Sequence, residues 1–309
     1  MVFGVVYASV LGFAAFPFKG PALAILRSYT AASGNVIDNL AYMCVVIPIS
    51  VIMLCGFIVA MRFIFRPNLS KLKDIDLEEY FVKQNLGKMS ARQKVLLGIL
   101  IASILLMFLP TIMPKSLAIT TFLNTLGSTG TMVLIVAIMV AVKVEGKALL
   151  NFRQAAGKIQ WDIAFLVMAA LYVAGALGSK DTGATQFFHD LFAPILGGRS
   201  ETSFAFFALI TGVILTNFGN NAAMGVLLMP IIHAFSGDGL FNPYVVVTLA
   251  TMIVFVALLT PVASPHAALL HGNKEWIKQK DVFLYGFSMT AWSILIAFFI
   301  GLPLARIIF

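Results

Sequence analysis

Charged side chains are scarce in this chain. Asp, Glu, Lys and Arg together make up 11% of its 309 residues, whereas a soluble domain carries about 25%. So few charges cannot cover a water-facing surface, which excludes an ordinary soluble protein. Hydrophobic residues make up 60% of the sequence, so lipid must be the solvent for most of the surface.

Cysteine is also rare, because the chain has only Cys44 and Cys55. They lie about three turns apart on one predicted helix, too far for a disulfide bond. Enzyme signatures are missing as well. The sequence has no His-Glu-x-x-His motif, no pair of aspartates inside apolar runs and no Ser/His pair in the predicted spans. We therefore expect no enzymatic activity.

Long apolar runs decide the fold class. Residues 40–65 and 95–113 are apolar almost without interruption. In lipid the backbone must satisfy its own hydrogen bonds, which leaves helices or closed barrels. Barrel strands would alternate in polarity over about ten residues. The pattern predicts an all-α polytopic membrane protein.

Two shorter runs, 203–215 and 222–234, interrupt the series of spans. A membrane span needs about 20 residues, so neither is expected to cross alone. Together they predict a re-entrant helical hairpin over 203–234 with a polar tip at 216–221. The remaining map has spans at 95–113, 129–144 and 161–178 before the hairpin, a span at 40–65, broken helices at 3–26 and 244–270, and a final span at 282–308.

The net charge of +8 does not indicate a nucleic-acid partner, because the basic residues lie in short loops between apolar runs. Such loops mark the cytoplasmic side. The loops 66–94, 145–160 and 272–281 fall on one side only if 203–234 enters and leaves the membrane on the same side. This predicts a protein of the cytoplasmic (inner) membrane with its C-terminus outside.

Proline spacing indicates an internal repeat. Pro17 and Pro21 lie four residues apart within one apolar run, and Pro261 and Pro265 do the same in another. Each pair should break its helix, and each broken helix is followed by a short polar loop and a full span. The loop charges give the two broken helices opposite orientations, as in an inverted-repeat transporter with discontinuous helices.

The repeats divide the chain at a basic segment. Residues 1–65 form the end of the first repeat, 66–94 a basic cytoplasmic linker and 95–309 the second repeat. Only the second repeat has a hairpin before its broken helix. We therefore expect a preceding N-terminal portion with a first hairpin.

The tip Gly219-Asn220-Asn221, preceded by Thr216-Asn217-Phe218, and the break Pro261-Val262-Ala263-Ser264-Pro265-His266 resemble the divalent anion:sodium symporter family, the carriers of dicarboxylates, citrate and sulfate. The family has Ser-Asn-Thr at such tips and Thr-Pro-Pro-Asn-like breaks. Here Gly219 replaces the serine, Asn221 the threonine, and His266-Ala267 the Pro-Asn. The first break, Lys19-Gly20-Pro21-Ala22, departs further.

This resemblance implies a secondary active transporter that moves a small anion, a di- or tricarboxylate, with sodium, and that forms a homodimer in the lipid bilayer. Sodium is the coupling ion, and no other cofactor is expected. Two alternatives stay open at this point. One is a proton-coupled or arsenite-type carrier of the same superfamily, and the other is a truncated, non-transporting membrane protein.

Helix ends at a break expose N–H groups that favour anions and carbonyl groups that favour cations. Asparagine offers both an amide oxygen and an NH₂ group. We expect sodium at Gly219, Asn220, Asn221 and Ala263. The predicted substrate- and ion-binding residues are Thr216, Asn217, Gly219, Asn220, Asn221, Ala263, Ser264, Pro265 and His266, with Lys19, Gly20 and Pro21 at the first break.

Lys19 is the only Lys or Arg that the map places near the bilayer centre, where a charge costs at least about 2.5 kcal/mol. Three hypotheses follow for its ammonium group: it occupies a cation position, it binds the substrate anion, or it is neutral against helix-end carbonyls.

Overall fold

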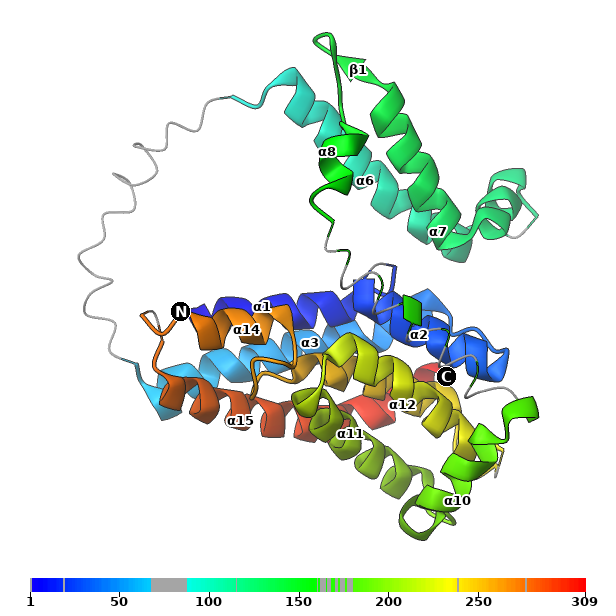
Figure 1. Cartoon of the computed structure of the whole chain (residues 1–309), viewed down its shortest axis with the longest axis vertical. Helices are drawn as coiled ribbons and strands as arrows, with labels where there is room; N and C mark the ends of the chain where they lie inside the picture. The colour runs from blue at the N-terminus through cyan, green and yellow to red at the C-terminus, as the bar shows by residue number, and fades with distance from the viewer. Residues whose placement is uncertain are drawn as a thin grey trace. The chain divides into compact units, whose positions relative to one another are not determined.

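The computed structural model describes most of the chain and divides it into two compact units (Figure 1). The first unit contains Met1–Ile64 and Trp161–Phe309, and the second contains Phe65–Gln160. The described residues are 2–18, 20–67, 88–114, 116–159, 180–237, 239–275 and 277–309, with 161, 165, 168, 169, 172 and 176 between them.

Helices make up the first unit. Five helical stretches among the described residues of the whole chain are long and apolar enough to cross a membrane, or six if a bent pair in the second unit counts as one span. The chain is therefore an all-α polytopic membrane protein, as predicted. The elements of the first unit are α1 (Val2–Ala15), α2 (Gly20–Ser33), α3 (Asn39–Ala60) with the π-helical turn η1 (Met61–Phe65), η2 (Lys180–Thr182), α10 (Ala184–Leu196), α11 (Glu201–Phe218), α12 (Asn221–Ser236), α13 (Pro243–Ile253) with the 3-10 turn η3 (Val254–Val256), α14 (Pro265–Gly272), α15 (Gln279–Ile296), η4 (Ala297–Gly301) and α16 (Leu302–Ile308).

The two broken helices pack antiparallel. The first half of one, α1, contacts the second half of the other, α14, while α2 contacts α13. Figure 1 shows α1 and α14 side by side at the end of the unit that holds the N-terminus. This crossed pairing of halves is the arrangement expected of inverted repeats.

The core of the first unit is built around α13. Every residue from 245 to 258 is buried, as expected for a helix that is apolar on all sides. The arm α12 packs closely on α2, because Gly225 has no Cβ to overlap the side chain of Ile25. The Ser28 hydroxyl donates to the Val226 carbonyl at 2.6 Å across the same contact.

The hairpin helices are longer than the apolar runs predicted. α11 has 18 residues and α12 has 16, because polar residues continue both helices beyond the apolar runs. Ser200 caps α11 and accepts a hydrogen bond from the Ser203 N–H at 3.4 Å. α11 therefore reaches the length of a candidate span, and the re-entrant path of the hairpin stays a prediction.

The second unit pairs two apolar helices, α6 (Ala91–Ile112) and α7 (Ala118–Ala141). A capping box of Ser90 and Gln93 starts α6. α7 bends by 98° between Ala118–Gly127 and Thr129–Ala141, where Gly127 has φ +64°. The span predicted at 129–144 is therefore shorter and follows a bend that no proline announces.

A small β-hairpin follows α7. β1 (Lys143–Val144) and β2 (Lys147–Ala148) pair antiparallel, so the end of the predicted span 129–144 is strand and not helix. Glu145 (φ 54°) and Gly146 (φ 75°) form the turn, which matches the positive φ values that tight hairpins require. The Arg92 guanidinium donates to the carbonyls of Ala148 (3.0 Å) and Leu149 (2.9 Å), and α8 (Phe152–Ala156) comes next.

Three predictions fall on residues outside those described. They are the role of Lys19, most of the basic linker 66–94 (residues 68–87) and most of the span 161–178.

Candidate functional site

The second broken helix is interrupted between η3 and α14, at residues 257–264. Pro265 is the first residue of α14, where a missing N–H costs nothing. Ser264 caps the new helix, and its hydroxyl oxygen accepts a hydrogen bond from the Ala267 N–H at 3.0 Å. The Ala263 N–H donates to the Thr260 carbonyl at 3.3 Å. The predicted proline break is thus present and has its own turn.

The hairpin tip is bonded directly to this break. The Asn217 amide oxygen accepts a hydrogen bond from the Leu259 N–H at 3.0 Å. The Thr260 hydroxyl donates to the Asn217 carbonyl, and the Asn221 N–H donates to the Ala263 carbonyl at 2.8 Å. Three bonds therefore fix the tip against the break, so the structure brings Asn217, Asn221 and Ala263 together.

Hydrogen-bond donors gather at the starts of α12 and α14. Asn220 caps α12, and its amide oxygen accepts from the Ala222 N–H at 2.9 Å, which leaves its NH₂ group to donate. The Ser264 hydroxyl oxygen accepts from Ala267 in the same way, which leaves its own proton available. Among the described residues, no hydrogen bond uses the backbone N–H of Ala223 or His266. Such a set of donors at two helix N-termini suits an anion.

Two of the predicted site residues, Thr216 and Gly219, serve the packing of the hairpin itself. The Thr216 hydroxyl donates to the Gly212 carbonyl of its own helix at 2.8 Å and is fully buried. At Gly219, a Cβ would lie 2.8 Å from the Met224 Cε. The missing side chain of Gly219 therefore makes room for Met224, which packs beneath the tip.

The first break lies between α1, which ends at Ala15, and α2, which starts at Gly20. α2 starts at Gly20, whose φ of +58° lies in the left-handed region, and Pro21 follows as its second residue. The Tyr42 hydroxyl on α3 donates to the Ala14 carbonyl at 2.7 Å. This bond satisfies a carbonyl that the end of α1 leaves without a helical partner.

His266 connects the two broken helices. Its Nε2 lies 3.1 Å from the Ser9 Oγ on α1, and its ring meets the Phe13 ring edge-on at 5.1 Å between centroids. His266 thus joins the start of α14 to α1, through two residues that were not among the predicted site residues of the first break.

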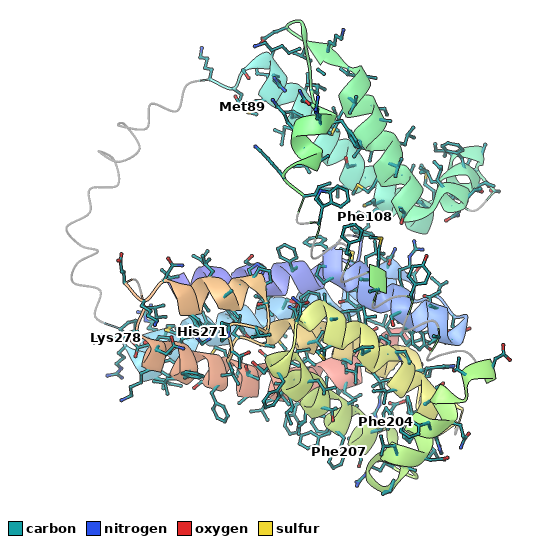
Figure 2. The ribbon with its side chains drawn as sticks, viewed as in Figure 1. Met89, Phe108, Phe204, Phe207, His271 and Lys278 are labelled. Atoms are coloured by element: carbon teal, nitrogen blue, oxygen red, sulfur yellow. The ribbon has the colours of Figure 1, made fainter. Side chains whose placement is uncertain are left out.

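Sequence reasoning missed several residues that hold the breaks, namely Ser9, Tyr42, Thr260 and His271. His271 is buried at the end of α14 beside α15 (Figure 2), with Nε2 3.2 Å from the Leu258 carbonyl and its other ring nitrogen bonded to Gln279. Thr260 had a signal, because it stands immediately before Pro261 in the break. The others form contacts across the fold that no local pattern announces.

Comparisons with known proteins identify the family of the chain. The family model for the sodium:sulfate symporter transmembrane region matches residues 1–309. A Haemophilus influenzae protein described as an uncharacterized transporter is 25% identical over 154 residues. The aligned segment covers 50% of this chain and 32% of that protein, so it spans about a third of the relative's length.

Proposed function

Because this chain belongs to the family of the sodium:sulfate symporter transmembrane region, we propose that it serves in secondary active transport of a small anion across the cytoplasmic membrane, driven by sodium. The proposed substrates are di- and tricarboxylates or sulfate. A proton-coupled reaction at the same site is the alternative that the experiment below separates.

The observation that carries this proposal is the bonding of the hairpin tip to the second break. Asn217 and Asn221 bond to Leu259, Thr260 and Ala263, which sets two helix N-termini beside one non-helical segment. Membrane proteins tolerate irregular backbone at depth where it is buried in protein or lines a water-filled path. In transporters such breaks bind substrate and coupling ion.

We assign the anion to the donors at the starts of α12 and α14. The Asn220 NH₂ group, the Ser264 hydroxyl and the Ala223 and His266 N–H groups would hold its oxygens, since all four can donate. A carbonyl oxygen such as that of Ala263 would face sodium, together with the backbone of Gly219 and Asn221. Transport then requires both charges to be bound, because the anion alone would leave uncompensated charge in the membrane.

The hairpin is proposed to be re-entrant, with the C-terminus outside. The three basic loops 66–94, 145–160 and 272–281 lie on one side of the membrane only in that case. A homodimer is proposed from the family resemblance.

Uptake of labelled succinate and sulfate into proteoliposomes of the intact protein tests the function. An inward sodium gradient is expected to drive saturable uptake of at least one of them, and a potassium gradient of the same size is not. Uptake that follows a pH gradient without sodium would replace sodium by the proton as coupling ion. No uptake of either anion under any gradient would contradict the proposal.

A further inference from the structure

Thr260 is a site residue that neither the family motif quoted above nor the sodium assignment includes. It lies in the second break, half-buried, one residue before Pro261. Its hydroxyl donates to the Asn217 carbonyl in the last turn of α11. Because α11 ends at Phe218, that carbonyl has no partner within its own helix. The hydroxyl therefore joins the hairpin to the break.

The bond to Asn217 uses the only proton of the Thr260 hydroxyl, which limits how the hydroxyl can interact with a bound ion. A threonine hydroxyl has one proton and two acceptor lone pairs, and here the proton is directed to Asn217. Among the described residues, no donor is bonded to the Thr260 oxygen. Toward a bound ion, Thr260 can therefore only accept, so it suits a cation and not an anion.

The backbone groups next to the Thr260 hydroxyl are also hydrogen-bond acceptors. Thr260 bonds through its own carbonyl to Ala263, and the Ala263 carbonyl in turn bonds to Asn221. Carbonyl and hydroxyl oxygens are the ligands that hard cations prefer. Among the described residues, no group of three His, Cys, Asp or Glu side chains could hold a metal ion; a cation bound at the break would be held by such neutral oxygens.

Asn220 and Ser264 can donate instead. The amide oxygen of Asn220 is bonded to Ala222 and the hydroxyl oxygen of Ser264 to Ala267, so each side chain keeps protons to donate. The hydrogen bonds thus distinguish donor groups at the helix starts from an acceptor at Thr260.

We propose that the Thr260 hydroxyl is a sodium ligand of this site, held in place by the Asn217 carbonyl, and that it sets the sodium affinity of transport. The proposal rests on the proposed function and refines it. It adds the Thr260 hydroxyl to the oxygens of the second break that would hold the cation.

The test compares three variants of the intact protein in proteoliposomes. Thr260→Val keeps the shape but removes the hydroxyl, Thr260→Ser keeps the hydroxyl, and Thr125→Val removes a hydroxyl that donates to a backbone carbonyl at 2.9 Å in the exposed part of α7. Sodium is titrated at saturating anion, and the anion is titrated at saturating sodium. Sodium-dependent thermal stabilisation of the detergent-purified protein is measured in parallel.

Thr260→Val is expected to raise the half-saturating sodium concentration by about threefold to tenfold, the range of one lost hydrogen-bonding or ligand group. The half-saturating anion concentration at saturating sodium should change by less than twofold. Thr260→Ser keeps the hydroxyl and should restore most of the sodium affinity that Thr260→Val loses, whereas Thr125→Val should match the wild type. If Thr260→Val is not recovered from the membrane, Thr260→Ala takes its place with the same expected shift.

Two results would overturn the inference. One is unchanged sodium dependence in both Thr260→Val and Thr260→Ala. The other is a change in anion affinity alone, which would make Thr260 an anion-side residue. A wild type that shows no sodium-driven uptake and no stabilisation by sodium would instead remove the proposed function, so the two failures are distinguishable.

Discussion

The two helix breaks share a proline spacing and differ in length. The first lies between Ala15 and Gly20, and the second lies between Val256 and Pro265. In each, the span that follows supplies a hydroxyl to a carbonyl at the end of the preceding half-helix. Tyr42 bonds to Ala14 at 2.7 Å, and Thr290 bonds to Val256 at 3.5 Å. Only the second break is described with a hairpin tip bonded to it.

This difference shows that the position of a break and its length have separate causes. Proline stops the helix at each break because it removes a hydrogen-bond donor and clashes with the preceding turn. The length of the non-helical segment depends on partners elsewhere in the fold. The Leu259 N–H finds its acceptor in the Asn217 side chain and not in a helix, and the Thr260 hydroxyl bonds to the Asn217 carbonyl. The hairpin thus holds open the longer break.

Removing the Asn217 amide is expected to have the largest effect, because it acts on that difference directly. Asn217→Leu leaves the Leu259 N–H without its acceptor and removes one of the bonds to the Val213 carbonyl, which keeps the Thr216 hydroxyl as a donor at 3.2 Å. The unpaired N–H costs about 1–3 kcal/mol. Sodium-driven uptake should be lost and the melting temperature in detergent should fall. Asn273→Leu is the control, since Asn273 also donates to the carbonyl four residues earlier, at 2.7 Å. Equal effects of the two variants would contradict the special role of the tip.

Filling the contact between α12 and α2 is expected to have the next largest effect. In Gly225→Val the new side chain overlaps Ile25, and such overpacking costs about 1–3 kcal/mol. α2 follows the first break and α12 follows the tip. The variant therefore tests whether both breaks depend on the packing of α2 against α12. Thermal unfolding and uptake should both be impaired. Gly12→Ala, where nothing lies within 4 Å, should leave both unchanged; similar losses in both variants would argue against this contact.

Tyr42→Phe examines the shorter break by itself. It removes the hydroxyl that bonds to the Ala14 carbonyl and keeps the ring. We expect a stability loss of about 1 kcal/mol, as for one hydrogen bond, with unchanged sodium dependence. The melting temperature in detergent and a sodium titration of uptake measure the two. A shifted sodium affinity would show that the first break also contributes to the cation site.

The smallest effect is expected at the far end of the hairpin. Arg306 forms an ion pair with Glu201 at the start of α11 and donates to the Thr202 hydroxyl at 2.7 Å. Exposed ion pairs contribute about 0–1 kcal/mol. Arg306→Gln should therefore lower the melting temperature only slightly and leave uptake intact. Loss of uptake would show that the base of the hairpin matters as much as its tip.

Much of this architecture was predictable from local patterns. The apolar runs gave the spans, and the proline pairs gave both breaks and the relation between them. The bend at Gly127 was not predicted, because no proline marks it and the predicted span begins only at residue 129. Gly146 is a weak indication of the turn at Glu145-Gly146, because the apolar run that precedes it favours a continuous span.

The site was predictable as a set of elements but not as a set of bonds. Gly219-Asn220-Asn221 and Ala263-Ser264-Pro265 stand out because polar and helix-breaking residues interrupt apolar runs. Which atom of Asn220 is free depends on a cap geometry that sequence does not specify. The contacts of Thr260 with Asn217 and of His266 with Ser9 join residues far apart in the chain, so they follow only from the packed fold.

The most direct measurement of the central claim is sodium-driven anion uptake by Asn220→Ala and Asn151→Ala in the intact protein. Both asparagines cap a helix, with side-chain oxygens that accept a backbone N–H at 2.9 Å and 3.1 Å. Loss of a cap alone costs about 1 kcal/mol, so both variants should insert and fold. If the hairpin tip forms the anion site, Asn220→Ala abolishes uptake and Asn151→Ala retains it. Normal uptake by Asn220→Ala would contradict the account.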